Sequence, residues 1–524
     1  MSRPADVRDR RAEEVRPAPP SGPRPALTPR AAVVGGGIAG LAAACGLAER
    51  GVDVTVLERE ESLGGRLRGW ETELADGSRA AMDRGFHAFF RQYYNLRGLL
   101  RRADPGLDSL VPLADYPLVH RDGPRDRFSG LPATPPWNAA VLAATSPSFP
   151  LRDLARVNLP AALHLLDVDV PGVYERLDHV SARDLLEAVR FPPTARHLAF
   201  EVFTRSFFAA PERLSAAELA VMFHLYFLGS SEGLVFDVPR APFPEALWEP
   251  LARYLGGLGA KVRTSAPVER VGPGADRRFS LPGHGSFDAV VLAADVPGTR
   301  SLAAASPDLG DAAWRSGLAR LESAPPFLVS RYWLDRPVRP HRPAFLGTAG
   351  YPTLDNISVL ERYRDAEREW ARRTGGSVVE LHAYALPGGC DPERERGALW
   401  EQAVSVYPEL GAAGVVDARH ELREDCPLFA PGSYRARPGT ATPDPFLVVA
   451  GDHVRTGLPV ALMERAATSG LLAANALLSR WGLPGHTLWT VPRRGRLAPA
   501  RALARLTRGA GRPQPGKRPV ERRR

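Results

Sequence analysis

A glycine-rich turn is the feature that most constrains the fold of this chain. Residues 35–40 read Gly-Gly-Gly-Ile-Ala-Gly and stand between the apolar run 31–34 and a helical pattern that extends to Arg50. A second run of strand composition, 52–57, follows at once. A strand, a glycine turn, a helix and a second strand in this order predict a βαβ unit of the Rossmann type, which binds dinucleotides.

Each part of this unit has a separate physical role. Gly35 permits the tight turn, Gly37 lets the backbone approach a pyrophosphate, and Gly40 lets the helix pack closely on the strand. Glu58, directly after the second strand, is suited to accept hydrogen bonds from ribose hydroxyls and would repel a 2′-phosphate. The predicted ligand is therefore FAD or NAD rather than NADP. A purely structural glycine turn in another α/β protein is the alternative.

Length and cysteine usage narrow the class of protein further. A chain of 524 residues is too long for one core, so two or three domains are expected. The three cysteines, Cys45, Cys390 and Cys426, are far apart and form no Cys/His cluster at metal-ligand spacing. The sequence therefore predicts neither a disulfide framework nor a metal site.

The net charge of +9 belongs to the two ends of the chain. Residues 1–30 contribute +3 and residues 492–524 contribute +11, which leaves −5 for the segment between them. Both ends are rich in Pro and Gly, so residues 1–30 and 483–524 are predicted to be disordered basic tails. Arginine-rich ends allow a nucleic-acid-binding protein as a non-enzymatic alternative, but the acidic body argues against a nucleic-acid partner.

Three further segments carry a resemblance to a known family. They are Gly64-Gly65-Arg66, the segment 259–271, and 446–452 followed by a helix that begins near Met463. Together with the glycine turn they resemble the flavoprotein oxidoreductases of the amine-oxidase and carotene-desaturase superfamily. The resemblance implies FAD as the cofactor. The residues that it assigns to FAD, beside those of the turn and Glu58, are Arg59, Gly65, Arg66, Val268, Asp452 and Met463.

The same resemblance implies a discontinuous architecture of the glutathione-reductase-like kind. An α/β Rossmann-type FAD-binding domain would be assembled from residues 31–100, 240–300 and 440–482. An inserted α+β substrate domain would take residues 101–239 and 301–439. The β-rich run 287–294, which ends before Asp295, is a plausible return strand of the nucleotide-binding sheet.

The block 83–97 indicates the substrate. It reads Asp-Arg-Gly-Phe-His-Ala-Phe-Phe-Arg-Gln-Tyr-Tyr-Asn-Leu-Arg, which is similar to the β-carotene desaturase/methyltransferases known as isorenieratene synthases. The resemblance implies that β-ionone rings of β-carotene are desaturated, with methyl migration within the molecule, to aromatic rings. The rings expected to enclose this apolar substrate are Phe86, Phe89, Phe90, Tyr93 and Tyr94. Packing between two domains is the alternative role of these rings.

His87 is the first candidate for a catalytic residue, with Asp83 and Arg84 as possible partners. A structural hydrogen-bonding role for His87 is the alternative. The lysine that many flavin amine oxidases place beside the flavin has no counterpart, because the only lysine of the body is Lys261 on the adenine side. Desaturation of a linear carotene such as phytoene, or another flavin amine-oxidase-superfamily oxidation, remains an alternative reaction.

A carotenoid substrate implies contact with a membrane surface. The first thirty residues show no continuous apolar core, and the uncharged stretches 31–48 and 128–151 are broken by glycines or prolines. We therefore expect a cytoplasmic protein that binds the membrane peripherally, with the segment 131–166 around Trp137 as a contact region. Electrons would pass from FAD to an acceptor such as oxygen or a quinone.

Overall fold

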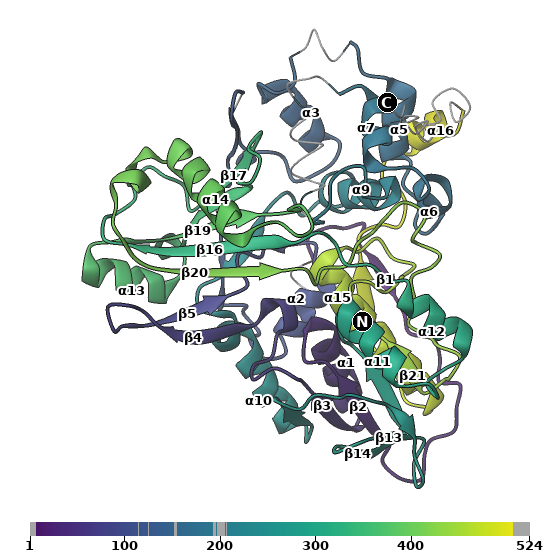
Figure 1. Cartoon of the computed structure of the whole chain (residues 1–524). Helices are drawn as coiled ribbons and strands as arrows, with labels where there is room; N and C mark the ends of the chain where they lie inside the picture. The colour runs from purple at the N-terminus through teal and green to yellow at the C-terminus, as the bar shows by residue number, and fades with distance from the viewer. Residues whose placement is uncertain are drawn as a thin grey trace, which may run out of the picture.

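The computed structural model describes residues 7–506 except 114, 124, 151–154, 192–194, 196–204 and 206 (Figure 1). A parallel sheet with its helices occupies the lower part of the view, and a larger mixed sheet lies above it on the left (Figure 1). Further helices form the upper end of the molecule.

The parallel sheet contains five strands, and each of them pairs in parallel with its neighbours. Its spatial order is β11 (Lys261–Arg263), β3 (Asp53–Leu57), β2 (Arg30–Val34), β15 (Ala289–Leu292) and β21 (Leu447–Val449). The four strands other than the edge strand β11 are almost entirely buried, because helices or small sheets cover both faces. All five strands come, within one residue, from the three stretches predicted for the FAD-binding domain.

One face of this sheet is covered by α1 (Ile38–Ala48) and α15 (Leu462–Arg480), which pack against each other. Every residue of α1 is buried. The two helices approach closely because small residues face each other: a Cβ on Gly470 would lie 2.2 Å from the Ala39 carbonyl oxygen. The helices α2 (Tyr94–Leu100) and α10 (Glu249–Gly257) pack beside them.

The other face packs on a small antiparallel sheet and on α11 (Val296–Ala305). The small sheet contains β12 (Gly272–Pro273), β13 (Phe279–Leu281) and β14 (Gly285–Phe287). The helix α12 (Ala312–Ala319) follows α11. Asp295 caps α11, because its Oδ1 accepts a hydrogen bond from the Gly298 N–H at 2.7 Å. The predicted return strand is therefore β15, and it ends three residues before this cap.

The second sheet has seven strands, which are antiparallel except for the pair β17 and β8. Its spatial order is β20 (Val415–Arg423), β16 (Phe327–Leu334), β19 (Ser377–Ala383), β18 (Asn356–Val359), β17 (Phe345–Ala349), β8 (Leu118–His120) and β9 (Arg125–Asp126). The helices α13 (Asp365–Thr374) and α14 (Pro392–Val406) pack on it. These strands come from the stretches predicted for the substrate domain.

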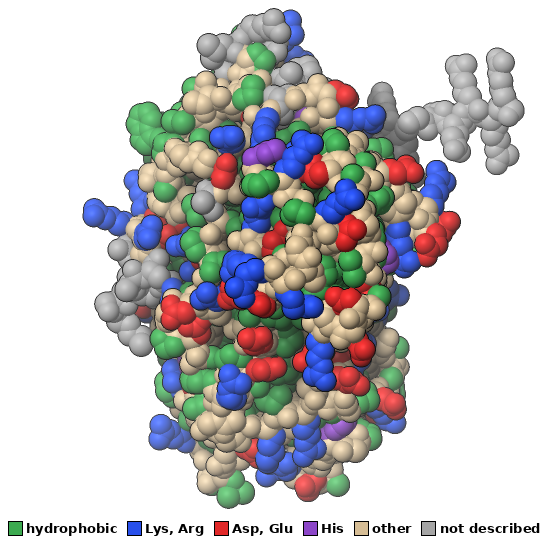
Figure 2. Space-filling model, turned by 90° about the vertical axis from the view of Figure 1, so that its left-hand side faces the viewer, with side chains coloured by type: hydrophobic (Ala, Val, Ile, Leu, Met, Phe, Trp, Pro, Cys, Tyr) green, Lys and Arg blue, Asp and Glu red, His purple; other side chains and the backbone are tan. Residues whose placement is uncertain are grey.

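Short strands connect the two layers. The strand β10 (Phe236–Pro239) pairs with β6 (Phe89–Phe90) on one side and with β7 (Leu110–Pro112) on the other. The hairpin of β4 (Gly69–Glu73) and β5 (Arg79–Asp83) lies near α13. Figure 2 shows the side of the molecule that lies on the left in Figure 1, and acidic and basic side chains are mixed over it. One exposed ion pair on α13 joins Arg368 and Asp365 at 2.6 Å.

The upper end of the molecule in Figure 1 is helical. Its helices are α3 (Trp137–Thr145), α5 (Leu159–Leu166), α6 (Gly172–Leu177), α7 (Ala182–Val189) and α9 (Ala216–Phe223), which continues into a π-helical turn (His224–Leu228). Along the part of the chain that the structure describes, no helix is long and apolar enough to cross a bilayer.

The prediction of two disordered tails is wrong for residues 7–30 and 483–506. The strand β1 (Glu13–Val15) pairs with β22 (Leu488–Thr490), and α16 (Ala498–Leu506) packs against α5. The buried Asp9 carboxylate accepts a hydrogen bond from Arg496 Nη2 at 2.7 Å. Acidic side chains of residues 7–30 form ion pairs and hydrogen bonds with arginines of residues 483–506, and these contacts hold the two ends in place. Residues 1–6 and 507–524 lie outside the described residues.

Candidate functional site

A cavity of about 520 Å³ extends from the glycine turn after β2 to aromatic side chains beside the second sheet. Its walls come from the turn 35–39, the segments 57–68 and 84–93, the start of α15, and strands of the second sheet. The cavity therefore joins the two parts of the molecule that the sequence assigned to FAD and to the substrate.

The glycine turn forms one end of the cavity, as its motif predicts. Gly35 has φ of +110°, and a Cβ there would lie 2.6 Å from the Ala293 carbonyl oxygen. A Cβ on Gly37 would make only ordinary contacts within the protein, the nearest being Gly65 Cα at 3.7 Å. Gly40 does not line the cavity; a Cβ there would lie 1.9 Å from the Gly35 oxygen, so Gly40 serves the close packing of α1 on the turn.

Glu58 closes the turn from the end of β3. Its Oε2 accepts a hydrogen bond from the Gly36 N–H at 2.6 Å, and its Oε1 accepts one from the Glu60 N–H at 3.0 Å. These bonds orient the carboxylate at the cavity wall, where Arg59 and Val268 also lie. Carboxylate oxygens have lone pairs beyond those in use, so Glu58 can still accept bonds from ribose hydroxyls.

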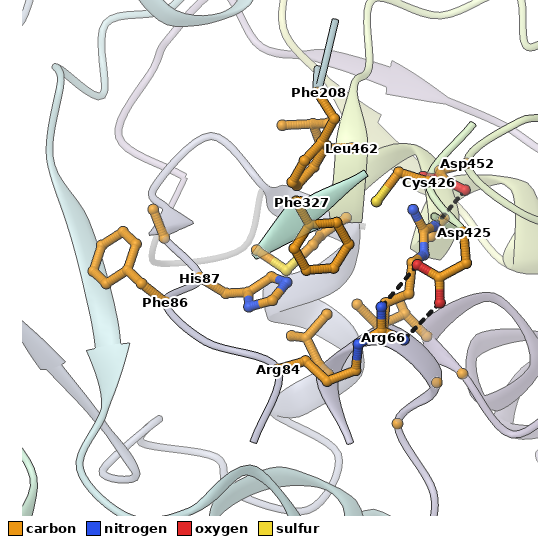
Figure 3. A pocket seen from close by; sticks show the side chains of 18 of the residues that line it. Arg66, Arg84, Phe86, His87, Phe208, Phe327, Asp425, Cys426, Asp452 and Leu462 are labelled. Atoms are coloured by element: carbon orange, nitrogen blue, oxygen red, sulfur yellow. Dashed lines mark hydrogen bonds and ion pairs between the residues drawn. The ribbon is translucent and has the colours of Figure 1, made fainter. Parts of the chain in front are cut away.

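A second glycine turn places an arginine opposite the first. Gly64 and Gly65 both have positive φ, of +109° and +58°, and a Cβ on Gly64 would lie 2.3 Å from Trp248 Nε1. The turn directs Arg66 into the cavity, where its Nη2 lies 2.6 Å from Asp452 Oδ1 (Figure 3). Although burial opposes the charge, Asp452 raises the pKa of Arg66 well above its ordinary value.

These residues fit FAD. The helices α1 and α15 both begin at the cavity without a side-chain cap, so their first N–H groups are available to phosphate or to flavin oxygen. Arg66 supplies positive charge, and Glu58 and Asp452 supply acceptors for hydroxyl groups. Met463, in the first turn of α15, lines the same wall. A pyrophosphate between two hydroxylated chains matches this set of donors and acceptors.

Three of the five predicted substrate-pocket rings line the cavity: Phe86, Phe90 and Tyr93. The prediction is wrong for Phe89 and Tyr94. Successive residues of a strand point to opposite sides, so Phe89 of β6 enters the core when Phe90 faces the cavity. Tyr94 begins α2 and its hydroxyl donates a hydrogen bond to Glu232 Oε1 at 3.2 Å, away from the cavity.

The structure also corrects the assignment of Asp83. Its carboxylate accepts hydrogen bonds from Arg331 Nη2 at 2.9 Å, Arg364 Nη1 at 2.6 Å and the Gly85 N–H at 2.9 Å. Asp83 is fully buried and does not line the cavity, and His87 Nδ1 bonds to the Gly85 carbonyl oxygen rather than to this carboxylate. Arg84 does line the cavity and forms a two-point ion pair with Asp425, with both distances 2.7 Å.

His87 points into the cavity beside Phe327 (Figure 3). Its Nδ1 lies 2.9 Å from the Gly85 carbonyl oxygen, to which it donates, so Nε2 carries the lone pair. Burial lowers the pKa of His87 to about 4. The imidazole is therefore neutral at physiological pH and adds no fixed charge beside Phe327.

Sequence reasoning missed the far wall of the cavity. Its residues come mainly from the second sheet and the segment before α9, and among them are Phe208, Phe327, Phe345, Asn356, His382 and Tyr384. The Phe208 ring meets both Phe327 and Tyr384 at centroid distances of 5.0 Å. Nothing in the local sequence marks these residues, because strands far apart in the chain bring them together.

The fold and this site define an FAD-dependent oxidoreductase. A family model described as flavin-containing amine oxidoreductase matches residues 38–478. The chain therefore belongs to the flavin-containing amine oxidoreductase family, and FAD is its cofactor.

Curated relatives place the chain within this family. It is 61% identical over 507 residues to carotenoid phi-ring synthase of Streptomyces griseus, covering 95% of this chain and 97% of that protein. It is 28% identical to carotenoid phi-ring synthase of Chlorobaculum tepidum, over 89% of this chain and 91% of the relative. Zeta-carotene desaturase of Synechocystis is 24% identical, over 86% and 97% of the two chains. These relatives confirm the resemblance to carotene desaturases drawn from the motifs.

Solved structures agree on the fold. Putrescine oxidase bound to putrescine superposes with a TM-score of 0.60 at 16% identity, over 87% of this chain and all of that chain. Cyclohexylamine oxidase from Brevibacterium oxydans gives a TM-score of 0.60 at 14% identity, over 86% and 99% of the two chains. At such identities the likeness shows the shared α/β architecture alone.

Proposed function

We propose that this protein oxidises β-ionone rings of β-carotene to aromatic rings, with methyl migration within the molecule. The observation that carries the proposal is the two-part lining of the cavity, where a dinucleotide cradle opens into a chamber of aromatic side chains. The 61% identity to a carotenoid phi-ring synthase supports an aromatic-ring product.

The chamber suits a conjugated hydrocarbon. Its rings contact one another, with centroid distances of 4.3 Å for Phe86 and Phe345 and 4.5 Å for Phe90 and Tyr226. Such a lining can enclose a polyene, which has no hydrogen-bonding groups of its own. The faces of aromatic rings also stabilise a positive charge, which the ring of the substrate carries after hydride loss.

The proposed conversion of a β-ionone ring into an aromatic ring determines how many hydrogen atoms the ring loses. A β-ionone ring has three ring methylene groups, and the aromatic product retains two ring C–H bonds after one methyl group has moved. Four hydrogens leave each ring, as two hydrides and two protons. FAD, when bound, accepts hydride from the substrate. The protein has to orient the ring, exclude water and receive the protons.

An amine-oxidase reaction receives no support from the cavity lining. Lys261 lies on the edge strand β11 with its Nζ 3.6 Å from Asp53 Oδ1, and its side chain is largely exposed. It does not line the cavity. We assign His87, neutral and in the chamber, to positioning the substrate ring and to receiving a proton at Nε2.

We further propose that the substrate enters from a membrane surface. Trp137 on α3, Leu159 on α5 and Leu506 on α16 are 65%, 58% and 85% exposed, and these helices lie together at the upper end of Figure 1. Large apolar side chains exposed at one end of a molecule favour interfacial binding. The protein would thus be peripheral on the cytoplasmic membrane. Oxygen or a quinone would be the electron acceptor.

The test is product formation in cells that accumulate β-carotene. Cells that express the protein should contain carotenoids with aromatic end rings, identified by absorption and by a mass four hydrogens lower for each ring. Cells that accumulate phytoene instead serve as the comparison. Desaturation of phytoene with unchanged β-carotene would contradict the proposal and favour a linear-carotene desaturase.

A further inference from the structure

A chain of two hydrogen bonds begins at the cavity and joins Tyr384, His382 and Glu380 at the end of β19. Tyr384 Oη lies 2.7 Å from His382 Nδ1, and His382 Nε2 lies 2.9 Å from Glu380 Oε1. Tyr384 and His382 line the cavity, whereas Glu380 lies behind them and is fully buried. Glu380 and His382 are two residues apart in the strand, so their side chains share one face of the sheet.

The partners of Glu380 fix the direction of these hydrogen bonds. Its Oε2 accepts bonds from Arg331 Nη2 at 2.6 Å and Nε at 3.0 Å. Although burial acts to raise it, the Arg331 guanidinium holds the pKa of Glu380 well below its usual range. Since Glu380 is ionised, His382 Nε2 donates to it, and Nδ1 accepts from the Tyr384 hydroxyl. The Phe86 N–H also points at Nε2, at 3.3 Å, but Nε2 cannot accept this longer bond while it carries the proton donated to Glu380.

Buried acidic and basic side chains surround Glu380. Asp83, Glu367 and Glu380 contact Arg331 and Arg364, with every N–O distance 3.7 Å or less. This cluster carries one negative charge in excess. The Arg331 guanidinium holds one Glu380 oxygen, and the other oxygen faces His382 Nε2.

The block 83–97 holds His382 in place. Gly85 has φ of +91°, and a Cβ there would lie 2.6 Å from His382 Cε1. Asn356 Nδ2 donates to Tyr384 Oη at 3.1 Å, and the Phe208 ring meets Tyr384 edge-on. One lone pair of the Tyr384 hydroxyl therefore remains for a group in the cavity.

We propose that Tyr384, His382 and Glu380 form a proton relay that takes a ring proton from the substrate cation. The proposal rests on the function proposed above. The electron pair of a ring C–H bond stays on the ring and becomes its new double bond. The proton goes to Tyr384 Oη while the phenol's own proton moves to His382 Nδ1. The resulting imidazolium is stabilised by the Glu380 carboxylate.

The relay supplies a second proton acceptor beside His87. Each ring loses two protons, and His87, held by Gly85 and without a carboxylate partner, receives one at Nε2. Tyr384 and His382 reach the cavity from the second sheet, and His382 lies against Gly85, close to the segment that carries His87. Glu380 and the Asp83 cluster are positioning groups that act through His382. This gives Asp83 a role in the site without contact with the substrate.

The test compares Tyr384→Phe, His382→Gln and Glu380→Gln with wild-type enzyme loaded with FAD and given β-carotene in vesicles. Each single variant is expected to lower kcat for the aromatic product about 100-fold. FAD content and KM should stay at the wild-type level. Because the residues act as a unit, the double variant Tyr384→Phe/Glu380→Gln should lose no more than the worse single variant.

Tyr254→Phe is the matched control. It also removes a hydrogen-bonded tyrosine hydroxyl, here one that donates to Glu49 Oε1 at 2.9 Å, but on α10 outside the cavity. Its kcat should equal that of the wild type. A loss below tenfold in Tyr384→Phe, or losses that multiply in the double variant, would overturn the relay. If Glu380→Gln does not fold, Tyr384→Phe/His382→Gln takes its place. Wild-type enzyme without aromatic product would instead refute the proposed function.

Discussion

Gly35 and Glu58 show how single residues shape the nucleotide cradle. Gly35 leaves β2 in a backbone conformation that other residues rarely adopt, and the Ala293 carbonyl leaves no room for a Cβ. The Glu58 carboxylate accepts a hydrogen bond from the N–H of Gly36, the residue that follows Gly35. The turn and the carboxylate expected to bind ribose therefore form one unit. A substitution at either residue should therefore alter the expected FAD site directly.

Replacement of Gly35 by Ala should cost about 1–2 kcal/mol of backbone strain and, in addition, push the turn away from Ala293. We expect purified Gly35→Ala to hold less than a tenth of the wild-type FAD, measured by flavin absorbance per protein. Gly51→Ala is the control, because Gly51 also has positive φ, of +79°, but no atom within 4 Å of a Cβ. Full FAD content in Gly35→Ala would refute the assigned role.

Among the elements, α3, α5 and α16 differ from the other helices in the apolar side chains they expose. The contact between α16 and α5 brings Leu506 and Leu159 to the same end of the molecule, although 347 residues separate them in the sequence. Other exposed apolar side chains, such as Leu258 after α10 and Val415 of β20, lie elsewhere. The three helices therefore form the candidate membrane contact.

The triple variant Trp137→Ser/Leu159→Ser/Leu506→Ser should bind vesicles at least tenfold more weakly, if each side chain contributes roughly 1 kcal/mol of apolar burial. Co-sedimentation with anionic vesicles measures the effect. The double variant Leu258→Ser/Val415→Ser removes exposed apolar side chains elsewhere and should bind like the wild type. Equal binding by the triple variant would exclude this contact surface.

In the whole molecule, one cavity joins the wall expected to hold the cofactor to the wall proposed for the substrate, and the two walls come from separately built layers. The wall expected to hold FAD takes residues from segments near 35, 65, 268, 295 and 452, which come together only in the folded chain. A ligand bound to such a wall stabilises the folded state and has no comparable site in the unfolded chain.

Addition of FAD to apoprotein should therefore raise its Tm, with a stabilisation of about 2.7 kcal/mol at a concentration 100 times Kd. Riboflavin is the matched ligand, because it has the same ring system but lacks the pyrophosphate and the adenosine. Thermal unfolding followed by circular dichroism should show a shift with FAD and little with riboflavin. Equal shifts would mean that the glycine turn and Arg66 do not carry the binding.

The turn expected to bind the nucleotide could be predicted residue by residue because its geometry is local. A tight turn, an open helix start and an acid at a strand end are fixed by neighbours in the sequence, so Gly35, Gly37, Glu58 and Arg66 all lie where their motifs indicate. The aromatic block was predicted less well. Composition identified it as ring-rich, but the direction of Phe89 and Tyr94 depends on strand pairing and on where α2 begins.

The sequence by itself therefore determined the nucleotide-binding turn and its cofactor, since neighbouring residues suffice to build them. Only the tertiary structure decided which rings face the substrate, that His382 lies against Gly85, and that Asp9 meets Arg496 across 487 positions. The physical reason is that sheet register and long-range ion pairing set these contacts. Neither leaves a periodic or compositional trace in the segments involved.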